Sequence, residues 1–254
     1  MTFLESVLVL LAGVAAGTIN TVVGSGTLIT FPTLLAVGYP PVVANVSNTI
    51  GLVPGSISGA IGYRDELRGQ RGRLLRLASA SLLGGLTGGV LLLSLPGEAF
   101  EGIVPALIAL ALVLVLAQPR LTAAVARRRE RAGATGRPRA GVPLWLGVFA
   151  TGIYGGYFGA AQGVLLIAVL GIGLAVSLQR ANALKNVLSA LVNGVAGLLF
   201  IALADVAWAP VALIAAGSIA GGQLGARIGR RLPPAVLRGV ILVVGIAAIA
   251  QMAL

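Results

Sequence analysis

The chain has 254 residues, of which 57% are hydrophobic and only 10% are charged, and its mean hydropathy is +1.01. A soluble domain carries about 25% charged residues, so this composition predicts a polytopic membrane protein. The sequence contains no cysteine and no histidine. That excludes disulfides, thiol chemistry, thiolate or imidazole metal sites and histidine-based catalytic triads.

The net charge of +11 raises the question of nucleic-acid binding, because basic clusters are the usual footprint of phosphate recognition. However, 12 of the 18 basic residues fall in two segments between apolar spans, 64–76 and 120–139. Arginine and lysine in short loops hold those loops on the cytoplasmic side of a membrane. We therefore interpret these residues as topology signals and expect no nucleic-acid partner.

Ten apolar segments follow one another along the chain, separated by short or charged linkers. They are 3–23, 25–38, 42–62, 74–95, 101–118, 142–159, 163–177, 183–204, 207–226 and 236–254. A full crossing needs about 20 residues, so 25–38 and 163–177 are too short to cross alone. The first segment carries Glu5 and lacks a positively charged region before its apolar run, so we expect a retained helix rather than a signal peptide.

The sequence repeats itself. AGVAAGTINTVVGSG (12–26) returns as FATGIYGGYFGAAQG (149–163), and VVANVSNTIG (42–51) is echoed by QRANALKNVL (179–188). Each half is predicted to hold a long helix, a glycine break, a short segment and three full spans. The fold class is therefore an all-α polytopic membrane protein, with about eight transmembrane helices, or about six plus re-entrant hairpins. The predicted domains are a first repeat (1–118), a basic linker (119–141) and a second repeat (142–254).

The charged loops orient the two halves. In the first half a basic loop (64–76) precedes a loop that holds Glu98 and Glu101; in the second half a loop with Asp205 precedes one rich in arginine. The positive-inside rule then places the halves upside down relative to each other. The 119–141 linker is predicted to be a flexible, cytoplasmic connector, with both termini outside.

The two glycine breaks are the first candidates for a binding site. A broken helix presents free N–H groups and the positive end of a helix dipole, which together suit an anion. A simple tight turn is the alternative interpretation. The candidate residues at the breaks are Gly24, Ser25, Gly26 and Thr27 in the first half and Gly159, Gln162 and Gly163 in the second.

Polar residues inside the spans are the second group of candidates. They are Asn45, Asn48 and Thr49 in the first half and Asn182, Lys185 and Asn186 in the second. A buried amide in a membrane protein either binds a neighbouring helix or faces a polar pocket, and recurrence at matched repeat positions favours a pocket. An ionisable group within a span is usually functional, although Lys185 has the alternative of reaching the membrane interface along its stem.

Acidic residues are absent from the middle of every predicted span. All seven acidic residues lie in loops or at span ends, whereas proton- or cation-coupled carriers and carboxylate-based membrane enzymes need a buried carboxylate. The sequence therefore favours an anionic substrate and no catalytic activity, cofactor or metal.

The early stretch AGTINTVVGSGTLITFPTLLAVGYPPVVANVSNTIG, its weaker second copy GIYGGYFGAAQGVLLIAVLGIGLAVSLQRANALKN and the basic central linker resemble the TauE/SafE sulfite exporter family of bacterial membrane transporters. The second copy departs from the pattern with Ala160, Ala161 and Gln162 where glycines are commoner. The resemblance implies export or exchange of small sulfur oxyanions or organosulfonates across the inner membrane.

We therefore predict a secondary transporter that moves a small anion by alternating access between two inverted repeats. Its expected partners are that anion and the lipid bilayer, with a homo-oligomer as an open possibility. Two alternatives remain at this point: a non-transporting subunit that docks a partner through the 119–141 linker, and an anion channel.

Overall fold

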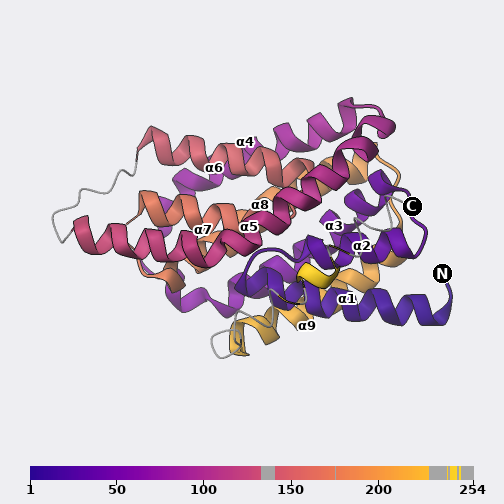
Figure 1. The fold of residues 1–254 in the computed structure, drawn as a ribbon, viewed down its shortest axis with the longest axis horizontal. Coiled ribbons are helices and arrows are strands. Elements are labelled where there is room, and N and C mark those ends of the chain that lie inside the picture. Colours follow the sequence, from indigo (N-terminus) through magenta and orange to yellow (C-terminus); the bar gives the residue numbers. More distant parts are fainter. Residues whose placement is uncertain (133–140, 175, 229–238, 240, 245, 247–254) are drawn as a thin grey trace.

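A computed structural model of the protein describes residues 1–132, 141–174 and 176–228 together with 239, 241–244 and 246 (Figure 1). The described residues form nine α-helices and one 3₁₀ helix. In chain order they are α1 (Phe3–Val22), α2 (Thr27–Ala36), α3 (Pro41–Gly62), η1 (Arg64–Leu67), α4 (Arg71–Ser94), α5 (Gly97–Ala132), α6 (Val142–Tyr157), α7 (Gln162–Gly173), α8 (Leu178–Leu203) and α9 (Trp208–Ile228). Most of the predicted span 236–254 lies outside the described residues.

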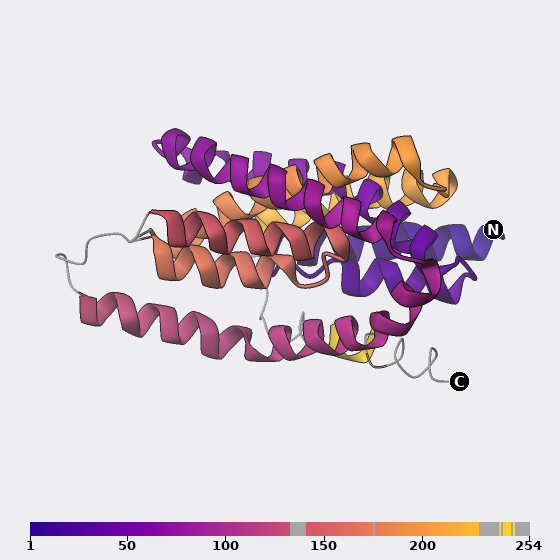
Figure 2. The same cartoon turned by 90° about the horizontal axis from the view of Figure 1, so that it is seen from above.

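The helices confirm the prediction of an all-α polytopic membrane protein. Within the described part, five helical stretches are long and apolar enough to cross a membrane: α1, α4, the first 28 residues of α5, α8 and most of α9. Helices α2 and α7 are short, with 10 and 12 residues. The long helices lie roughly along one common direction (Figure 1), and α5 runs along one side of the others (Figure 2).

The fourth helix of each half packs against the first helix of the other half. Helix α9 packs along α1, and α4 packs along α6. Glycine makes both contacts close: a Cβ atom on Gly221 would lie 2.1 Å from the carbonyl oxygen of Val14, and one on Gly88 would lie 2.1 Å from that of Ile153. Glycines spaced four residues apart on α4 (Gly84, Gly88) and on α9 (Gly217, Gly221, Gly225) thus serve backbone-to-backbone packing between the halves.

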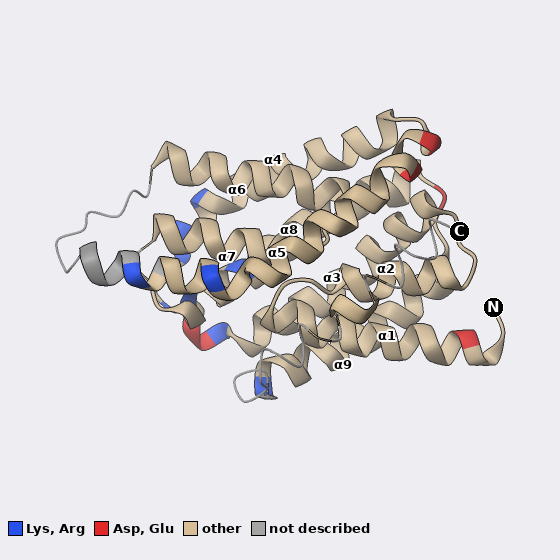
Figure 3. Ribbon diagram, in the orientation of Figure 1, with Lys and Arg blue, Asp and Glu red and all other residues tan. Residues whose placement is uncertain are grey.

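Equivalent helices of the two halves run in opposite directions. Along α1 and α9, Leu10 meets Gly217 and Thr18 meets Gly225, so these two helices are parallel, and α9 follows the loop with Asp205. Helices α4 and α6 are likewise parallel, and both start at the end that holds the basic segments. By the sequence repeat α6 corresponds to α1 and α4 corresponds to α9, so each helix runs opposite to its counterpart. Figure 3 shows lysine and arginine gathered toward one end of the bundle and most acidic residues at the other. The inverted arrangement is therefore present in the fold. We refer to these as the basic end and the acidic end.

The two short helices return to the end from which their partners started. The start of α3, just after α2, lies beside the acidic loop, where Val42 Cγ2 is 3.9 Å from the Cβ position of Gly97. The start of α8, just after α7, lies at the basic end, where Arg180 Nη2 donates a hydrogen bond to the carbonyl oxygen of Arg68 at 3.4 Å. Each hairpin, α1–α2 from the acidic end and α6–α7 from the basic end, therefore starts and ends at the same end of the bundle, the arrangement expected of re-entrant hairpins.

The prediction that 119–141 is a flexible connector is partly wrong, because much of this segment is helical. Helix α5 continues without interruption to Ala132, because the residues after Pro119 are mostly alanine, leucine, arginine and glutamate, which favour helix. Leu121 also packs against the core. Residues 133–140 lie outside the described residues, and the boundaries of the three predicted domains stay predictions.

Candidate functional site

The two sequence repeats form the same local structure at the two breaks. Gly24 and Gly159 both have a positive φ, +89° and +77°. Each N–H bonds a carbonyl oxygen five residues earlier, Gly24 to Ile19 and Gly159 to Tyr154, both at 3.0 Å. Glycine adopts this left-handed conformation without steric cost and ends helices in this way. The repeated glycines are therefore helix stops at the same place in each half.

The two breaks touch each other at the centre of the molecule. The N–H of Gly163 donates to the carbonyl oxygen of Gly24 at 3.0 Å. A Cβ atom on Gly24 would lie 2.3 Å from the Cα of Gly163, and one on Gly163 would lie 2.4 Å from the Cα of Gly24. Only a residue without a side chain fits on either side, so the hairpin tips meet backbone to backbone.

Two asparagines at matched repeat positions bind the ends of the broken helices. Asn45 Nδ2 of α3 donates to the carbonyl oxygen of Tyr157 at 2.9 Å, and Asn182 Nδ2 of α8 donates to that of Thr21 at 3.1 Å. In each case the asparagine of one half satisfies a carbonyl in the last turn of the other half's broken helix, where no intrahelical donor exists. The sequence favoured a shared pocket for this pair, which stays a prediction; in the structure each amide nitrogen binds a helix of the other half.

Lys185 is fully buried at the same junction. Its Nζ donates to the carbonyl oxygens of Asn20 at 2.7 Å and Thr21 at 3.1 Å, at the end of α1. A cation is stabilised there because the carbonyl end of a helix carries partial negative charge. With no exposed surface, Lys185 does not reach the membrane interface, which removes that alternative. No ion pair is recorded for it among the described residues.

Other predicted residues tie the short helices to their neighbours. Asn48 of α3 donates from Nδ2 to Thr27 Oγ1 at 3.2 Å, and its Oδ1 accepts from the Thr30 hydroxyl. Thr49 is buried on the same helix. The Cβ position of Gly26, just before α2, is 2.6 Å from the carbonyl oxygen of Ala16, so α1 and α2 pack tightly here. These residues hold the first hairpin together.

Several buried polar atoms near the tips have no hydrogen-bond partner in the described part of the chain. They are Ser25 Oγ, Asn45 Oδ1, Gln162 Nε2, Asn182 Oδ1 and Asn186 Nδ2. An unsatisfied buried group costs about 1 to 3 kcal/mol, so a concentration of them indicates a place that meets water or a polar ligand. These five belong to predicted site residues, and Tyr157 Oη at the end of α6 is a further such atom outside that set.

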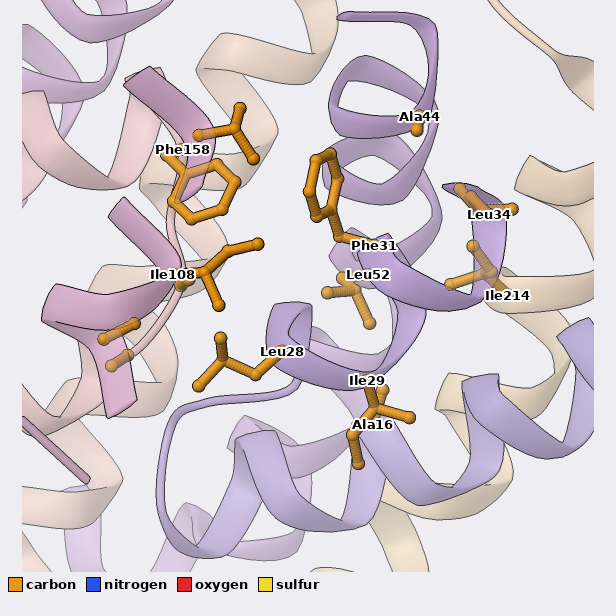
Figure 4. Close-up of a cluster of buried hydrophobic side chains, with 14 of the residues drawn as sticks. Ala16, Leu28, Ile29, Phe31, Leu34, Ala44, Leu52, Ile108, Phe158 and Ile214 are labelled. Carbon is orange, nitrogen blue, oxygen red and sulfur yellow. The ribbon is translucent and has the colours of Figure 1, made fainter. Parts of the chain in front are cut away.

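Aromatic rings cover the tips on the acidic side. Phe31 of α2 and Phe158, which follows α6, make an edge-to-face contact with ring centroids 5.3 Å apart, and Phe100 lies 6.2 Å from Phe158. Figure 4 shows Phe31 and Phe158 facing each other above Leu28. All three rings are buried. Sequence analysis did not include them, because a buried phenylalanine looks the same whether it fills a core or closes a path.

Sequence analysis also missed the acceptors of the lysine and asparagine contacts. These are the carbonyl oxygens of Asn20, Thr21 and Tyr157, and a carbonyl group leaves no signal in residue type. Two cavities, of about 120 Å³ beside α7 and about 620 Å³ beside α3, are lined by none of the predicted site residues. The polar centre lies in neither cavity, and its residues Asn45, Asn182 and Lys185 are themselves buried.

The family of the chain follows from its comparison with known proteins. The family model described as Sulfite exporter TauE/SafE matches residues 9–252. The chain belongs to the TauE/SafE family. The matched residues include most of α1 and all of α2, α6 and α7.

Two relatives agree with this assignment. The probable membrane transporter protein YfcA of Escherichia coli K12 is 27% identical over 231 residues, which cover 90% of this chain and 82% of that protein. A probable membrane transporter protein of Haemophilus influenzae is 25% identical over 243 residues, covering 94% and 91%. No solved structure matches the chain. This TauE/SafE protein is thus a multi-pass membrane transporter.

Proposed function

We propose that this TauE/SafE protein moves a small anion, sulfite or a related sulfur oxyanion or organosulfonate, by alternating access between its inverted halves. The observation that carries the proposal is Lys185, a fully buried cation at the meeting point of two broken helices. Burying an ionisable group inside a membrane protein costs free energy, and such groups usually mark substrate or ion pathways.

The charge balance around Lys185 favours an anion over a cation. The acidic residues Asp65, Glu98, Glu101 and Asp205 are exposed, and none forms an ion pair with Lys185 in the described part of the chain. A buried ammonium group without a carboxylate partner is stabilised by carbonyl dipoles alone, and a bound anion would supply the missing opposite charge.

The donors at the tips suit an oxyanion. An ammonium group has three N–H donors, and two of those of Lys185 are used by the carbonyls of Asn20 and Thr21. The Nδ2 of its neighbour Asn186 and the Nε2 of Gln162 have no partner in the described structure. Gln162 precedes Gly163, whose Cβ position is 3.0 Å from Lys185 Cδ. We assign the anion to this group of donors.

Alternating access would separate and rejoin the hairpin tips. Five hydrogen bonds cross between the halves there: Gly163 to Gly24, Asn45 to Tyr157, Asn182 to Thr21, and two from Lys185 to Asn20 and Thr21. Rocking of one half against the other around the anion would break some of these bonds in each state. In this proposal the protein lies in the inner membrane with the basic end cytoplasmic and the termini outside.

The test is sulfite flux in proteoliposomes that contain the purified protein, with sulfate, chloride and a small sulfonate as competitors. A carrier gives saturable sulfite uptake that a chemically related anion inhibits. Flux that never saturates and is accompanied by unitary conductance would make the protein a channel. Absence of flux with every anion, in protein shown to be folded, would reject the proposal.

A further inference from the structure

An open apolar groove lies on the outside of the bundle, at the seam between the two halves. Its volume is about 620 Å³, and it lies between the second half of α3 and the middle of α8, with Leu82 of α4 as a third wall. Val53, Ile57 and Ile61 line one side and Leu191 and Leu198 the other. The groove is separate from the polar centre, and none of its lining residues belongs to the proposed anion site.

The dimensions of the groove match one leaflet of a membrane. From Val53 to Ile61 helix α3 advances about 12 Å at 1.5 Å per residue, with Arg64 just beyond its end, and the hydrocarbon core of one leaflet is about 15 Å deep. Ile57, Ile61 and Leu198 are each roughly half exposed or more. Gly194 leaves the middle open, because a Cβ atom there would meet nothing within 4 Å. An acyl chain fits such a slot.

The basic end of the groove carries an arginine without an acidic partner. Arg64 lines the groove and is exposed at its end, and no ion pair is recorded for it among the described residues. Its neighbour Arg68, in contrast, pairs with Asp65 at 3.0 Å, and Arg180 binds the carbonyl oxygen of Arg68. A free guanidinium at the mouth of an apolar slot is complementary to a phosphate attached to an acyl chain.

We propose that this groove binds an anionic phospholipid from the leaflet at the basic end, with an acyl chain between α3 and α8 and the headgroup phosphate at Arg64. The lipid touches both halves of the protein, since α3 belongs to the first repeat and α8 to the second. This inference does not depend on the identity of the transported anion.

The test is native mass spectrometry of the full-length protein in detergent, titrated with phosphatidylglycerol or with phosphatidylcholine. The unmodified protein is expected to retain one phosphatidylglycerol in preference to phosphatidylcholine. Arg64→Gln should weaken phosphatidylglycerol retention by about fivefold, the effect of one basic residue on an anionic lipid. Arg73→Gln, at the same end but outside the groove, should leave it unchanged.

A second pair of variants tests the slot rather than the charge. Gly194→Leu fills the groove and should abolish retention of the lipid, whereas Gly102→Leu on α5, also in open space, should not. Equal retention in all variants, or equal binding of both lipids, would overturn the proposal. A change of oligomeric state in Gly194→Leu, with no lipid lost, would assign the groove to a second copy of the chain and equally overturn it.

Discussion

Lys185 combines a structural contact with the charge that the proposed substrate needs. Its ammonium group closes the end of α1 through the carbonyls of Asn20 and Thr21, and such hydrogen bonds from a charged group are worth about 1.5 to 3 kcal/mol. The first prediction concerns its replacement. Lys185→Met keeps much of the apolar stem and removes the charge, so it should abolish saturable sulfite uptake. It should also lower the free energy of unfolding by about 1.5 to 3 kcal/mol, the contribution of those hydrogen bonds.

The control for this variant is Arg180→Gln, which removes an exposed cation from the same helix. Uptake in proteoliposomes and unfolding in detergent would be measured for both. Saturable uptake by Lys185→Met with an unchanged half-saturation concentration would remove Lys185 from the anion site and leave it a purely structural role.

The asparagine pair supplies the second prediction. Asn45→Ala and Asn182→Ala each delete one bond between the halves, and interhelical bonds of this kind contribute about 0.6 to 2 kcal/mol. Because the two contacts are related by the repeat, the variants should lower the free energy of unfolding by similar amounts. Denaturant titration of both in detergent checks this, and a loss confined to one variant would show that the contacts are not equivalent.

At the scale of the elements, the glycine breaks decide the architecture. The sequence predicted both breaks, and they are present at Gly24 and Gly159 with the same helix-ending geometry. It did not predict that the tips touch, because Gly24 and Gly163 meet only after each hairpin has folded. Nor did it predict the helical extension of α5. A run of arginines is compatible with a solvated loop and with a helix, and the packing of Leu121 against the core favours the helix.

The third prediction separates conformation from contact at these tips. Gly24→Ala and Gly38→Ala both place a side chain at a positive φ, +89° and +93°, but only Gly24 has another backbone within reach. Gly38→Ala should lower the free energy of unfolding by about 1 to 2 kcal/mol and leave transport unchanged. Gly24→Ala should destabilise the protein considerably more and abolish transport, as measured by unfolding and by sulfite flux. Equal stability of the two variants would mean that the tips are not in contact.

At the scale of the whole molecule, the opposite directions of the two halves put unlike charges at the two ends of the bundle. The positive-inside rule predicts that the basic end is cytoplasmic. The fourth prediction uses the absence of cysteine from the chain, since a single introduced cysteine is then the only thiol. A membrane-impermeant thiol reagent should label Glu98→Cys in intact cells and Arg73→Cys only after permeabilisation.

The reverse labelling pattern would place the basic end outside and would contradict the predicted cytoplasmic linker. Labelling of both variants in intact cells would show that one of these loops is reached through the protein. Expression and folding of each variant would be checked by its elution from size-exclusion chromatography.

The sequence by itself determined the class of the protein, the number of repeats, their opposite orientation and the positions of the breaks. Apolarity, loop charge and glycine spacing are properties of single residues and short segments, and they survive in any arrangement of the helices. Only the tertiary structure decided that the short segments re-enter, that Asn45 and Asn182 reach across the halves and that Lys185 lies against the end of α1. Those contacts end on backbone carbonyls, which every residue carries, so only the packing of the helices selects which carbonyls are bound.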